Sequence, residues 1–309
     1  MKGIQCFSSR PIQTGRDISG YAKYAKDYID LPDYMLLTLC LSALQWRKTN
    51  GEITLHTDTL FYNYLSEKKV TSFWNNIVCS LDNISDKFPG INHAVFWSAG
   101  KFYCYLIESA PFVCVDTDLI VWKKLNFNPN HDLMFTHWES IETEDTSYID
   151  QSGIQVSNAY NFIDVNTKIT KGLNMSITAL LNEEFKNLFT KKATEFMLSS
   201  TKNYDGSYAT PEILYMEQVL PVQIALKYGF NISPFIQCTW SPKQFRFISQ
   251  DKKLGDWIFN SFNENHICTH LWFHKNYIDK NNEARKEYLD SIIYVFKKNF
   301  PEEYDMINF

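Results

Sequence analysis

The sequence offers no C-x-x-C pair and no even set of cysteines from which to build a disulfide framework. Its seven cysteines are scattered along the chain. They are Cys6, Cys40, Cys79, Cys104, Cys114, Cys238 and Cys268. This usage argues against a disulfide framework and against a zinc ribbon, and it favours a reducing compartment.

Long hydrophobic runs are also missing. The longest apolar stretch, Tyr34–Leu44, is too short and too interrupted to span a bilayer. Residues Met1–Gln5 lack the apolar core of a signal peptide. We therefore expect a cytoplasmic protein without a transmembrane segment, which leaves peripheral membrane contact open.

The chain has no excess of positive charge, no internal repeat, no low-complexity tract and no Pro/Gly/Ser linker. Its formal net charge is −5, so we expect no nucleic-acid partner. The 309 residues suffice for one large core or two modest ones. Aromatic residues reach 16 %, which suits sugar-facing surfaces and suits large aromatic cores equally well.

The most informative stretch is Phe112–Trp122. Its first half is an apolar, β-branched-rich run after Pro111, which is typical of a buried strand. Asp116 and Asp118 interrupt that run, and a second apolar run follows at once. Burying an isolated carboxylate is costly unless it is paired or coordinates a metal. The pair therefore predicts a bound divalent cation or a second, unseen partner.

Strand and helix signals alternate before this stretch. The expected elements are a strand over Ile4–Phe7, a helix from Asp33 through Trp46, a strand over Glu52–Asp58, a helix from Thr59 and a helix over Ala94–Ser109. Asp33 and Asp58 are candidate N-caps. This order predicts an α/β fold with a mostly parallel sheet. Asp116 and Asp118 then lie at the carboxyl end of a strand, where open α/β sheets bind ligands.

The second half of the chain is more elaborate. We expect strands over Leu133–Trp138, within Gly172–Ile177 and over Ile232–Cys238, with helices over Glu183–Leu198 (capped by Asn182), Glu212–Tyr228 (interrupted at Pro221) and Glu283–Phe300. The acidic segment Glu139–Ser152 reads as a solvated loop.

Three histidines, His266, His270 and His274, recur at four-residue spacing near the C-terminus. That spacing puts them on one face of a helix or of a strand. Neutral imidazole suits transition metals. Without a carboxylate nearby in the sequence the run is a weak metal signal, and a structural role explains it as well.

The acidic pair and its surroundings resemble a known family. An apolar strand leading into Asp116–Asp118 and on into Leu119–Val121 resembles the D-x-D motif of glycosyltransferases with the GT-A fold, nearest to the glycogenin and lipopolysaccharide-galactosyltransferase group. In that group a Lys or Arg on the preceding helix faces the nucleotide sugar, and Lys101 stands in this place. A C-terminal His-x-x-Gly-x-x-Lys segment supplies the third metal ligand and a diphosphate contact, the places of His270 and Lys275. This chain departs by lacking the Gly and by a shorter spacing.

The resemblance implies a GT-A-type α/β fold and a hexosyltransferase. The donor would be a nucleotide sugar, most simply a UDP-sugar, and the acceptor a glycan or small molecule, with retention of configuration. Mn²⁺ or Mg²⁺ would stabilise the charge of the leaving diphosphate as a Lewis acid. Two carboxylates and one imidazole fit these ions better than a closed zinc site, which usually recruits cysteine.

The resemblance also assigns roles to individual residues. Asp118 is the direct metal ligand, whereas Asp116 binds the metal or the ribose. Asn174, Glu217 and Gln218 are expected to face the donor sugar or the acceptor. The structural alternatives are that Asn174 is an ordinary turn residue and that Glu217 and Gln218 are ordinary surface residues. The implied catalytic residues are Asp118, Glu217 and Gln218; the implied donor-binding residues are Ser8, Asp58, Lys101, Asp116, Asn174 and Lys275; the implied metal ligands are Asp116, Asp118 and His270.

The same assignment divides the chain into a catalytic domain over 1–275 and a helical tail over 276–309. Within the domain, 1–122 is the nucleotide-binding half and 123–275 the half that completes the acceptor and metal sites. A catalytically silent module that binds a nucleotide or glycan is one alternative. A haloacid-dehalogenase-type phosphatase, with the first Asp as nucleophile, is another. Against the phosphatase, its motif normally lies near the N-terminus with Thr or Val where this chain has Ile120.

Overall fold

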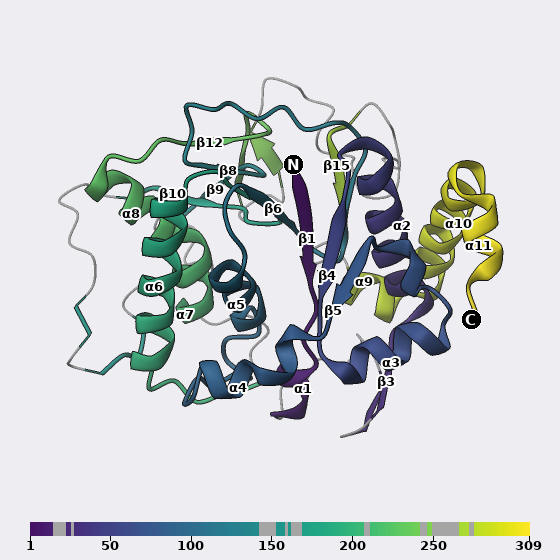
Figure 1. The fold of residues 1–309 in the computed structure, drawn as a ribbon, viewed down its shortest axis with the longest axis horizontal. Coiled ribbons are helices and arrows are strands. Elements are labelled where there is room, and N and C mark those ends of the chain that lie inside the picture. Colours follow the sequence, from purple (N-terminus) through teal and green to yellow (C-terminus); the bar gives the residue numbers. More distant parts are fainter. Residues whose placement is uncertain are drawn as a thin grey trace.

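The computed structural model describes residues 1–14, 23–25, 28–141, 153–157, 160–161, 169–206, 211–241, 246–248, 266–271 and 275–309. At its centre is a seven-stranded sheet in the order β12-β8-β11-β6-β1-β4-β5 (Figure 1). The strands are β1 (Lys2–Cys6), β4 (Ile53–His56), β5 (Asn76–Val78), β6 (Phe112–Val115), β8 (Leu133–Phe135), β11 (Ile177–Leu180) and β12 (Ile232–Pro234). β11 is antiparallel to both of its neighbours, and the other pairs are parallel. The predicted α/β fold with a mostly parallel sheet is confirmed.

Helices cover both faces of this sheet (Figure 1). On one face lie α2 (Asp33–Thr49), α3 (Thr59–Glu67), α9 (Lys275–Lys280), α10 (Asn282–Asn299) and α11 (Pro301–Met306); on the other lie α5 (Ala99–Ile107), α6 (Glu183–Ser199) and α8 (Leu220–Tyr228). Successive side chains of β6 point alternately into the hydrophobic cores on the two faces of the sheet. Val113 packs in the core beside α2, and Phe112 and Cys114 pack in the core beside α5. This two-sided burial explains why β6 is apolar throughout.

The strand order reverses between β1 and β6. From β1 the chain builds outward through β4 to β5, then returns to place β6 on the other side of β1. In open α/β sheets, ligands bind in the crevice at such a switch point, beyond the carboxyl ends of the strands. The short helix α1 (Arg10–Gln13) follows β1 at this edge, and Asp116 and Asp118 follow β6.

The first half largely matches the sequence prediction. Asp58 caps α3, since its side chain accepts a hydrogen bond from the Phe61 N–H. Asp33 is not the cap of α2: Pro32 holds the N-cap position, and Asp33 is the first helical residue. The smaller elements are β2 (Lys23–Ala25), β3 (Tyr28–Asp30), the 3₁₀ turns Thr71–Phe73 and Ser80–Asn83, and α4 (Ile84–Lys87).

Helix α5 is shorter than predicted, because the segment from Ala94 to Ser98 is not part of it. The Asn92 side chain accepts a hydrogen bond from the Ala94 N–H at 3.1 Å. The Asn92 carbonyl accepts one from the Phe96 N–H at 2.9 Å. These bonds close a separate turn, and the helix restarts at Ala99. Local side-chain bonding of Asn competes with helix in this way.

The expected strand over Leu133–Trp138 is two strands. β8 ends at Phe135, and β9 (Trp138–Ser140) joins a second sheet with β10 (Lys171–Leu173), β13 (Thr239–Ser241) and β14 (Arg246–Ile248). Glu139 is fully buried in β9, so the solvated-loop prediction is wrong there. Residues 142–152 of that predicted loop lie outside the described residues. The strand expected over Ile232–Cys238 ends already at Pro234, which lacks an N–H for the ladder.

The helix predicted over Glu212–Tyr228 contains a π-helical turn. α7 (Pro211–Leu214) leads into this turn, Tyr215–Val219, and α8 follows until Gly229, whose φ is +76°. The break precedes Pro221 rather than lying at it. Pro221 has no N–H for the carbonyl of residue 217, so the regular helical bond is absent there. Single π turns are frequent at functional sites. The capped helix from Asn182 is confirmed as α6.

The C-terminal helices pack on α2. The Tyr34 hydroxyl donates to Asp279 at 2.8 Å, and the Thr38 and Tyr288 hydroxyls are 2.8 Å apart. The division at 275/276 stays a prediction, and α9 spans that boundary. Among the described residues no helix is long and apolar enough to cross a membrane.

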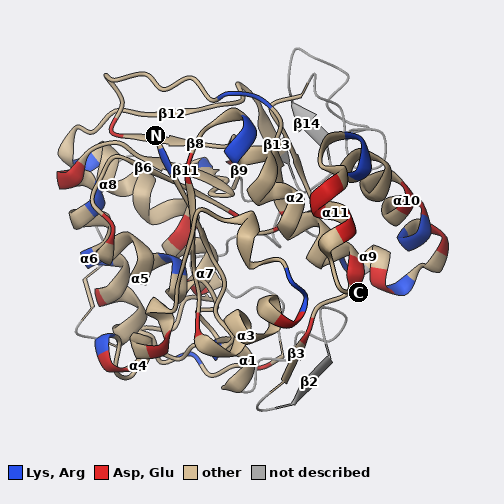
Figure 2. Ribbon diagram, turned by 45° about the vertical axis from the view of Figure 1, so that its right-hand side comes forward, with Lys and Arg blue, Asp and Glu red and all other residues tan. Residues whose placement is uncertain are grey.

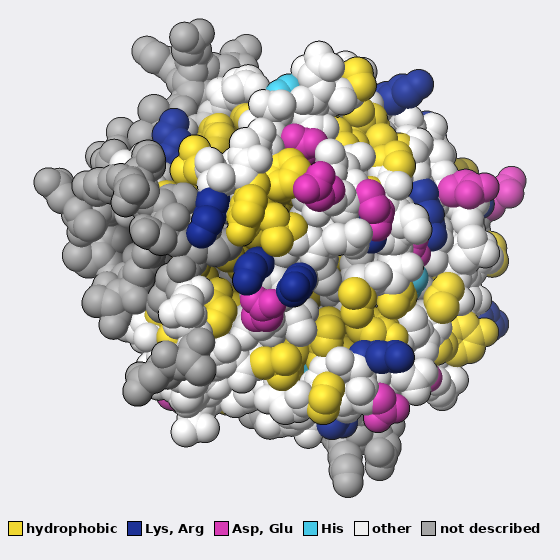
Figure 3. Space-filling view, turned by 60° about the vertical axis from the view of Figure 1, so that its left-hand side comes forward, with side chains coloured by type: hydrophobic (Ala, Val, Ile, Leu, Met, Phe, Trp, Pro, Cys, Tyr) yellow, Lys and Arg dark blue, Asp and Glu magenta, His cyan; other side chains and the backbone are white. Residues whose placement is uncertain are grey.

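The central strands carry few charges, and most charged residues lie on helices and connections (Figure 2). On the face shown in Figure 3, hydrophobic side chains form small groups between charged ones. Leu198 at the end of α6 and Leu226 and Tyr228 in α8 are among the exposed large hydrophobic residues.

Candidate active site and metal centre

A two-stranded ribbon brings the distant His270 to the acidic pair. β7 (Leu119–Val121) follows Asp118 directly, and β15 (Cys268–His270) pairs with it antiparallel, with His270 opposite Leu119. The Leu271 N–H then donates to the Asp118 carbonyl at 2.9 Å. This register sets the imidazole beside the carboxylate although 152 positions separate them in the sequence.

Asp116, Asp118 and His270 form a set of potential metal ligands. One ligand atom from each lies within 4.8 Å of the other two. His270 Nε2 and Asp118 Oδ1 are 3.5 Å apart. Two ligands at right angles and about 2.2 Å from one ion are roughly 3.1 Å apart, so a small adjustment seats a cation between them. Carboxylate oxygens suit Mg²⁺ and Mn²⁺ and imidazole suits transition metals, so this mixed set is able to hold a divalent cation.

Lys275, the first residue of α9, binds the same carboxylate. Its Nζ lies 2.7 Å from Asp118 Oδ2. Burial by itself raises the pKa of the Asp118 carboxyl, but Lys275 and then His270 outweigh it and hold this pKa well below its usual range. Asp118 is therefore an anion at any physiological pH.

Lys101 links Asp116 to Glu217. Its Nζ lies 2.6 Å from Asp116 Oδ1 and 3.6 Å from Glu217 Oε1. Burial alone lowers the pKa of the Lys101 ammonium, but the two carboxylates raise it well above its usual range. Lys101 thus stays charged although it is almost enclosed.

The π-helical turn places Glu217 beside Lys101. Burial raises the pKa of the Glu217 carboxyl, and Lys101 offsets part of this effect. Gln218, the next residue, packs against β10, since a Cβ built on Gly172 lies 3.3 Å from the Gln218 Cβ. Glu217 and Gln218, which the sequence analysis treats as a pair, therefore have different surroundings.

Asn174 belongs to a buried polar network behind the acidic pair. Its Nδ2 donates to Glu139 Oε1 at 2.6 Å, and its Oδ1 accepts from the Ser176 N–H at 3.3 Å. The Ser176 carbonyl in turn accepts from the Asp116 N–H at 2.8 Å. The sequence does not indicate this buried contact of Glu139, because its acidic surroundings are typical of a loop. Only the strand pairing of β9 with β10 reveals its position.

Ser8 and Asp58 lie at the ends of β1 and β4, on the same edge of the sheet. Asp58 Oδ2 accepts from the Ser9 N–H at 2.6 Å, and its Oδ1 accepts from the Phe61 N–H at 3.0 Å. Burial raises the pKa of the Asp58 carboxyl. Both of its oxygens thus already hold backbone groups. Ser8 packs against α5, with its Cβ 3.4 Å from a Cβ built on Gly100.

The structure therefore joins most of the predicted site residues. One charged cluster contains six of them: Asp116, Asp118, Lys101, Glu217, His270 and Lys275. Asn174 is linked to this cluster through Ser176, which hydrogen-bonds both to the Asn174 side chain and to the Asp116 N–H. Ser8, Asp58 and Gln218 are held in separate contacts. Of the three spaced histidines, only His270 is in the ligand set found among the described residues; His274 lies outside them.

Residues 1–308 match the family model described as "Family of unknown function (DUF6734)". The chain belongs to this family. None of the curated proteins matches it.

Several solved structures share a distant likeness with this DUF6734 chain. The galactosyltransferase LgtC, in complex with donor and acceptor sugar analogues, is 9 % identical over 76 % of this chain and 73 % of that chain, with a TM-score of 0.36. Mouse xyloside xylosyltransferase 1, in its apo form, is 10 % identical over 75 % and 84 %, with a TM-score of 0.40. The inositol-1-phosphate CTP transferase from T. maritima is 11 % identical over 82 % and 93 %, with a TM-score of 0.35.

Proposed function

We propose that this chain is a metal-dependent glycosyltransferase of the GT-A type. It would move a sugar from a nucleotide-sugar donor, a UDP-sugar in the first instance, to a glycan or small-molecule acceptor with retention. The observation that carries the proposal is the convergence of Asp116, Asp118 and His270 at the switch-point edge of the sheet, with Lys101 and Lys275 on either side.

The ligand set supports a role for Mn²⁺ or Mg²⁺. When bound there, such an ion supplies Lewis-acid stabilisation to a leaving diphosphate. Asp118 is the best candidate for direct coordination, because it is anionic and lies close to His270. Asp116 faces Lys101 on the other side, so it suits either the ion or the ribose of the donor.

The charges of the site suit a diphosphate. Lys101 and Lys275 carry two positive charges against the three negative charges of Asp116, Asp118 and Glu217, so the ionised set has a net charge of −1. A divalent cation changes this sum to +1, which then favours an anion. The two ammonium groups are placed to neutralise diphosphate oxygens once a cation occupies the carboxylates.

Glu217 is the acidic group best placed to act on the sugar. Transfer passes through an oxocarbenium-like state, which a nearby carboxylate stabilises. Lys101 at 3.6 Å keeps a cation beside Glu217, and the π-helical turn fixes its position. Gln218 and Asn174 stay proposed as further contacts for the sugar or the acceptor.

Thermal melting with nucleotides and metal tests the proposal. We expect UDP to raise the melting temperature in the presence of Mn²⁺ and to have little effect in EDTA, with GDP and CMP as comparisons. Ligand at 100 times its dissociation constant adds about 2.7 kcal/mol of stability. Slow, metal-dependent hydrolysis of a UDP-sugar would further exclude a silent binding module. If no nucleotide gives a metal-dependent shift, the proposal is wrong.

Lys275→Met separates metal binding from nucleotide binding. Lys275 occupies Asp118 Oδ2, so its removal frees a carboxylate oxygen that a cation can use. We expect the variant to bind Mn²⁺ alone about tenfold more tightly, and UDP in saturating Mn²⁺ about tenfold more weakly, since a charged contact to phosphate is lost. Calorimetric titration measures both. Parallel weakening of the two affinities would contradict this arrangement.

A further inference from the structure

A cationic residue follows β1 at the switch point of the sheet, as the acidic pair follows the neighbouring strand β6. Arg10 is the first residue of α1, directly after the loop that leaves β1. The residue is half-buried, and its Nε is enclosed. In the part of the chain that the structure describes, this Nε has no hydrogen-bond partner and the guanidinium has no carboxylate in an ion pair.

His93 adds a second polar atom without a partner. The residue is only 4 % exposed, and no atom among the described residues bonds to its Nε2. Burial and then the nearby charge of Arg10 lower the pKa of His93 to about 4. The imidazole is thus neutral at physiological pH, and the Arg10 charge contributes to keeping it so. Buried polar atoms are rarely left unpaired, so the pair points to a ligand.

The backbone around Arg10 is fixed relative to the charged cluster. Asp58 holds the Ser9 N–H at 2.6 Å, and the Ser8 hydroxyl accepts from the Arg10 N–H at 3.2 Å. Ser8 packs against Gly100, the residue before Lys101. Arg10 therefore belongs to the β1 side of the switch point, and Asp116 and Asp118 to the β6 side.

We infer that Arg10 and His93 form a phosphate subsite for the nucleotide of the donor, separate from the metal-binding carboxylates. The subsite lies on the half of the sheet built by β1, β4 and β5, so the phosphate nearest the nucleoside is the group it would take. Guanidinium is the side-chain group best suited to phosphate oxygens. Lys101 and Lys275 are already paired with carboxylates, whereas no carboxylate of the described residues forms an ion pair with Arg10. The inference rests on the proposed nucleotide-sugar donor.

Titration of UMP in EDTA tests the subsite without the metal. We expect wild-type protein to bind UMP measurably, Arg10→Gln to bind it about tenfold more weakly and Arg10→Lys to fall between them, because a charge-assisted contact is lost. His93→Gln should weaken UMP binding as well. Uridine, which has no phosphate, should bind wild type and Arg10→Gln equally. Thermal melting of each variant without ligand checks that the fold is intact.

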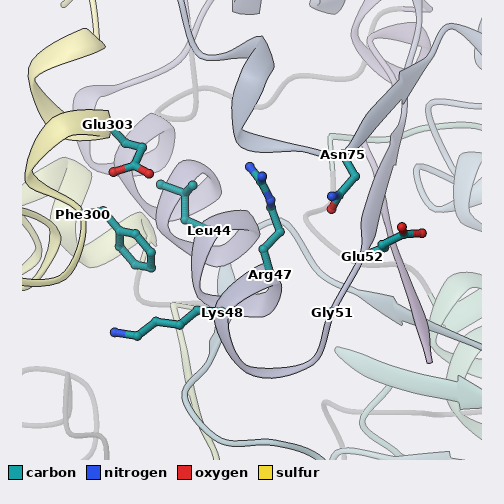
Figure 4. A pocket seen from close by; sticks show the side chains of 8 residues that line it. All are labelled: Leu44, Arg47, Lys48, Gly51, Glu52, Asn75, Phe300 and Glu303. Carbon is teal, nitrogen blue, oxygen red and sulfur yellow. The ribbon is translucent and has the colours of Figure 1, made fainter.

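Arg47→Gln is the matched control. Arg47 lines a surface pocket of about 470 Å³ together with Lys48, Glu52 and Phe300 (Figure 4). That pocket adjoins the segment entering β4, at the edge of the sheet opposite to the crevice. The Arg47 guanidinium is engaged there by the carbonyls of Ser72 and Phe73. The control removes the same charge, and UMP affinity should not change.

The outcomes separate this inference from the proposed function. If Arg10→Gln binds UMP like wild type, or if wild type binds neither UMP nor inorganic pyrophosphate in EDTA, the subsite is wrong, while a Mn²⁺-dependent UDP shift would keep the glycosyltransferase proposal. If Arg10→Gln lowers the affinities for uridine and for UMP by the same factor, Arg10 contacts the base and the phosphate assignment is overturned. If Arg10→Gln weakens binding of inorganic pyrophosphate but wild type binds no nucleotide, the anion site stands and the donor proposal fails.

Discussion

Asp118→Asn is expected to lower metal-dependent turnover of a nucleotide sugar by about 1,000-fold, or roughly 4 kcal/mol of transition-state stabilisation. The amide keeps the shape of the side chain but removes the charge that lies between His270 and Lys275. The variant should also lose the Mn²⁺-dependent melting shift given by UDP. Loss of cation binding should therefore lower both turnover and the UDP-dependent melting shift, and the two measurements are made in parallel.

The same substitution should change stability in a pH-dependent way. The depressed pKa of Asp118 means that its ionic contribution to folding is present above the usual pKa of an aspartate, about 3.9, and is lost as pH falls through the lower folded value. Breaking a buried pair costs about 3 kcal/mol or more near neutral pH. Denaturant unfolding should thus separate wild type from variant at neutral pH and bring them together in acid.

Asp290→Asn is the control for Asp118→Asn. Asp290 is exposed on α10, so the same chemical change should leave turnover and stability nearly unaffected. Full metal-dependent activity in Asp118→Asn would overturn the metal centre. Equal losses in both variants would show that net charge, and not the site, controls activity.

Glu217→Gln is expected to reduce kcat about 100-fold or more while leaving the KM for the donor within a few-fold. This split is expected because the proposed role of Glu217 is to stabilise positive charge that exists only in the transition state. Steady-state kinetics with a UDP-sugar measure it. An unchanged kcat, or a loss confined to KM, would assign Glu217 to ground-state binding instead.

Glu217→Gln should also stabilise the fold. Burial raises the folded pKa of Glu217, so the protonated form is favoured and the stability it contributes is lost as pH rises through that folded value. Above that folded pKa wild type carries a buried carboxylate, and the neutral amide removes this cost. The melting temperature of the variant should exceed that of wild type at pH 8 and approach it in acid. Glu287→Gln on the exposed face of α10 should show neither effect.

Local sequence signals predicted the elements that lead into the site. The apolar run of β6, the D-x-D after it and the capped helix from Asp58 each depend on neighbours within a few residues. For that reason their positions were predictable. The boundary of α5 was not, because the Asn92 side chain closes a turn that a periodicity argument does not register.

Long-range pairing determined what the sequence did not reveal. Glu139 is acidic in an acidic stretch, and only its place in β9 makes it a buried partner of Asn174. Lys101 and Glu217 were both candidates, yet their contact depends on the π-helical turn beside β10. Arg10 stands in an ordinary polar turn of the sequence. Its Nε has no hydrogen-bond partner among the described residues, which is visible only once its neighbours are placed.

The ribbon of β7 and β15 ties the acidic pair to the C-terminal helices through α2. The Ser42 hydroxyl of α2 donates to the Leu119 carbonyl, and Gln45 donates to the Trp122 carbonyl at 3.2 Å. α10 rests on the same helix through Tyr288 and Thr38. If a cation occupies the proposed site and these contacts couple it to the docking of α10, thermodynamic reciprocity applies. The factor by which docking of α10 on α2 changes the affinity for the cation must then equal the factor by which the cation changes the docking of α10.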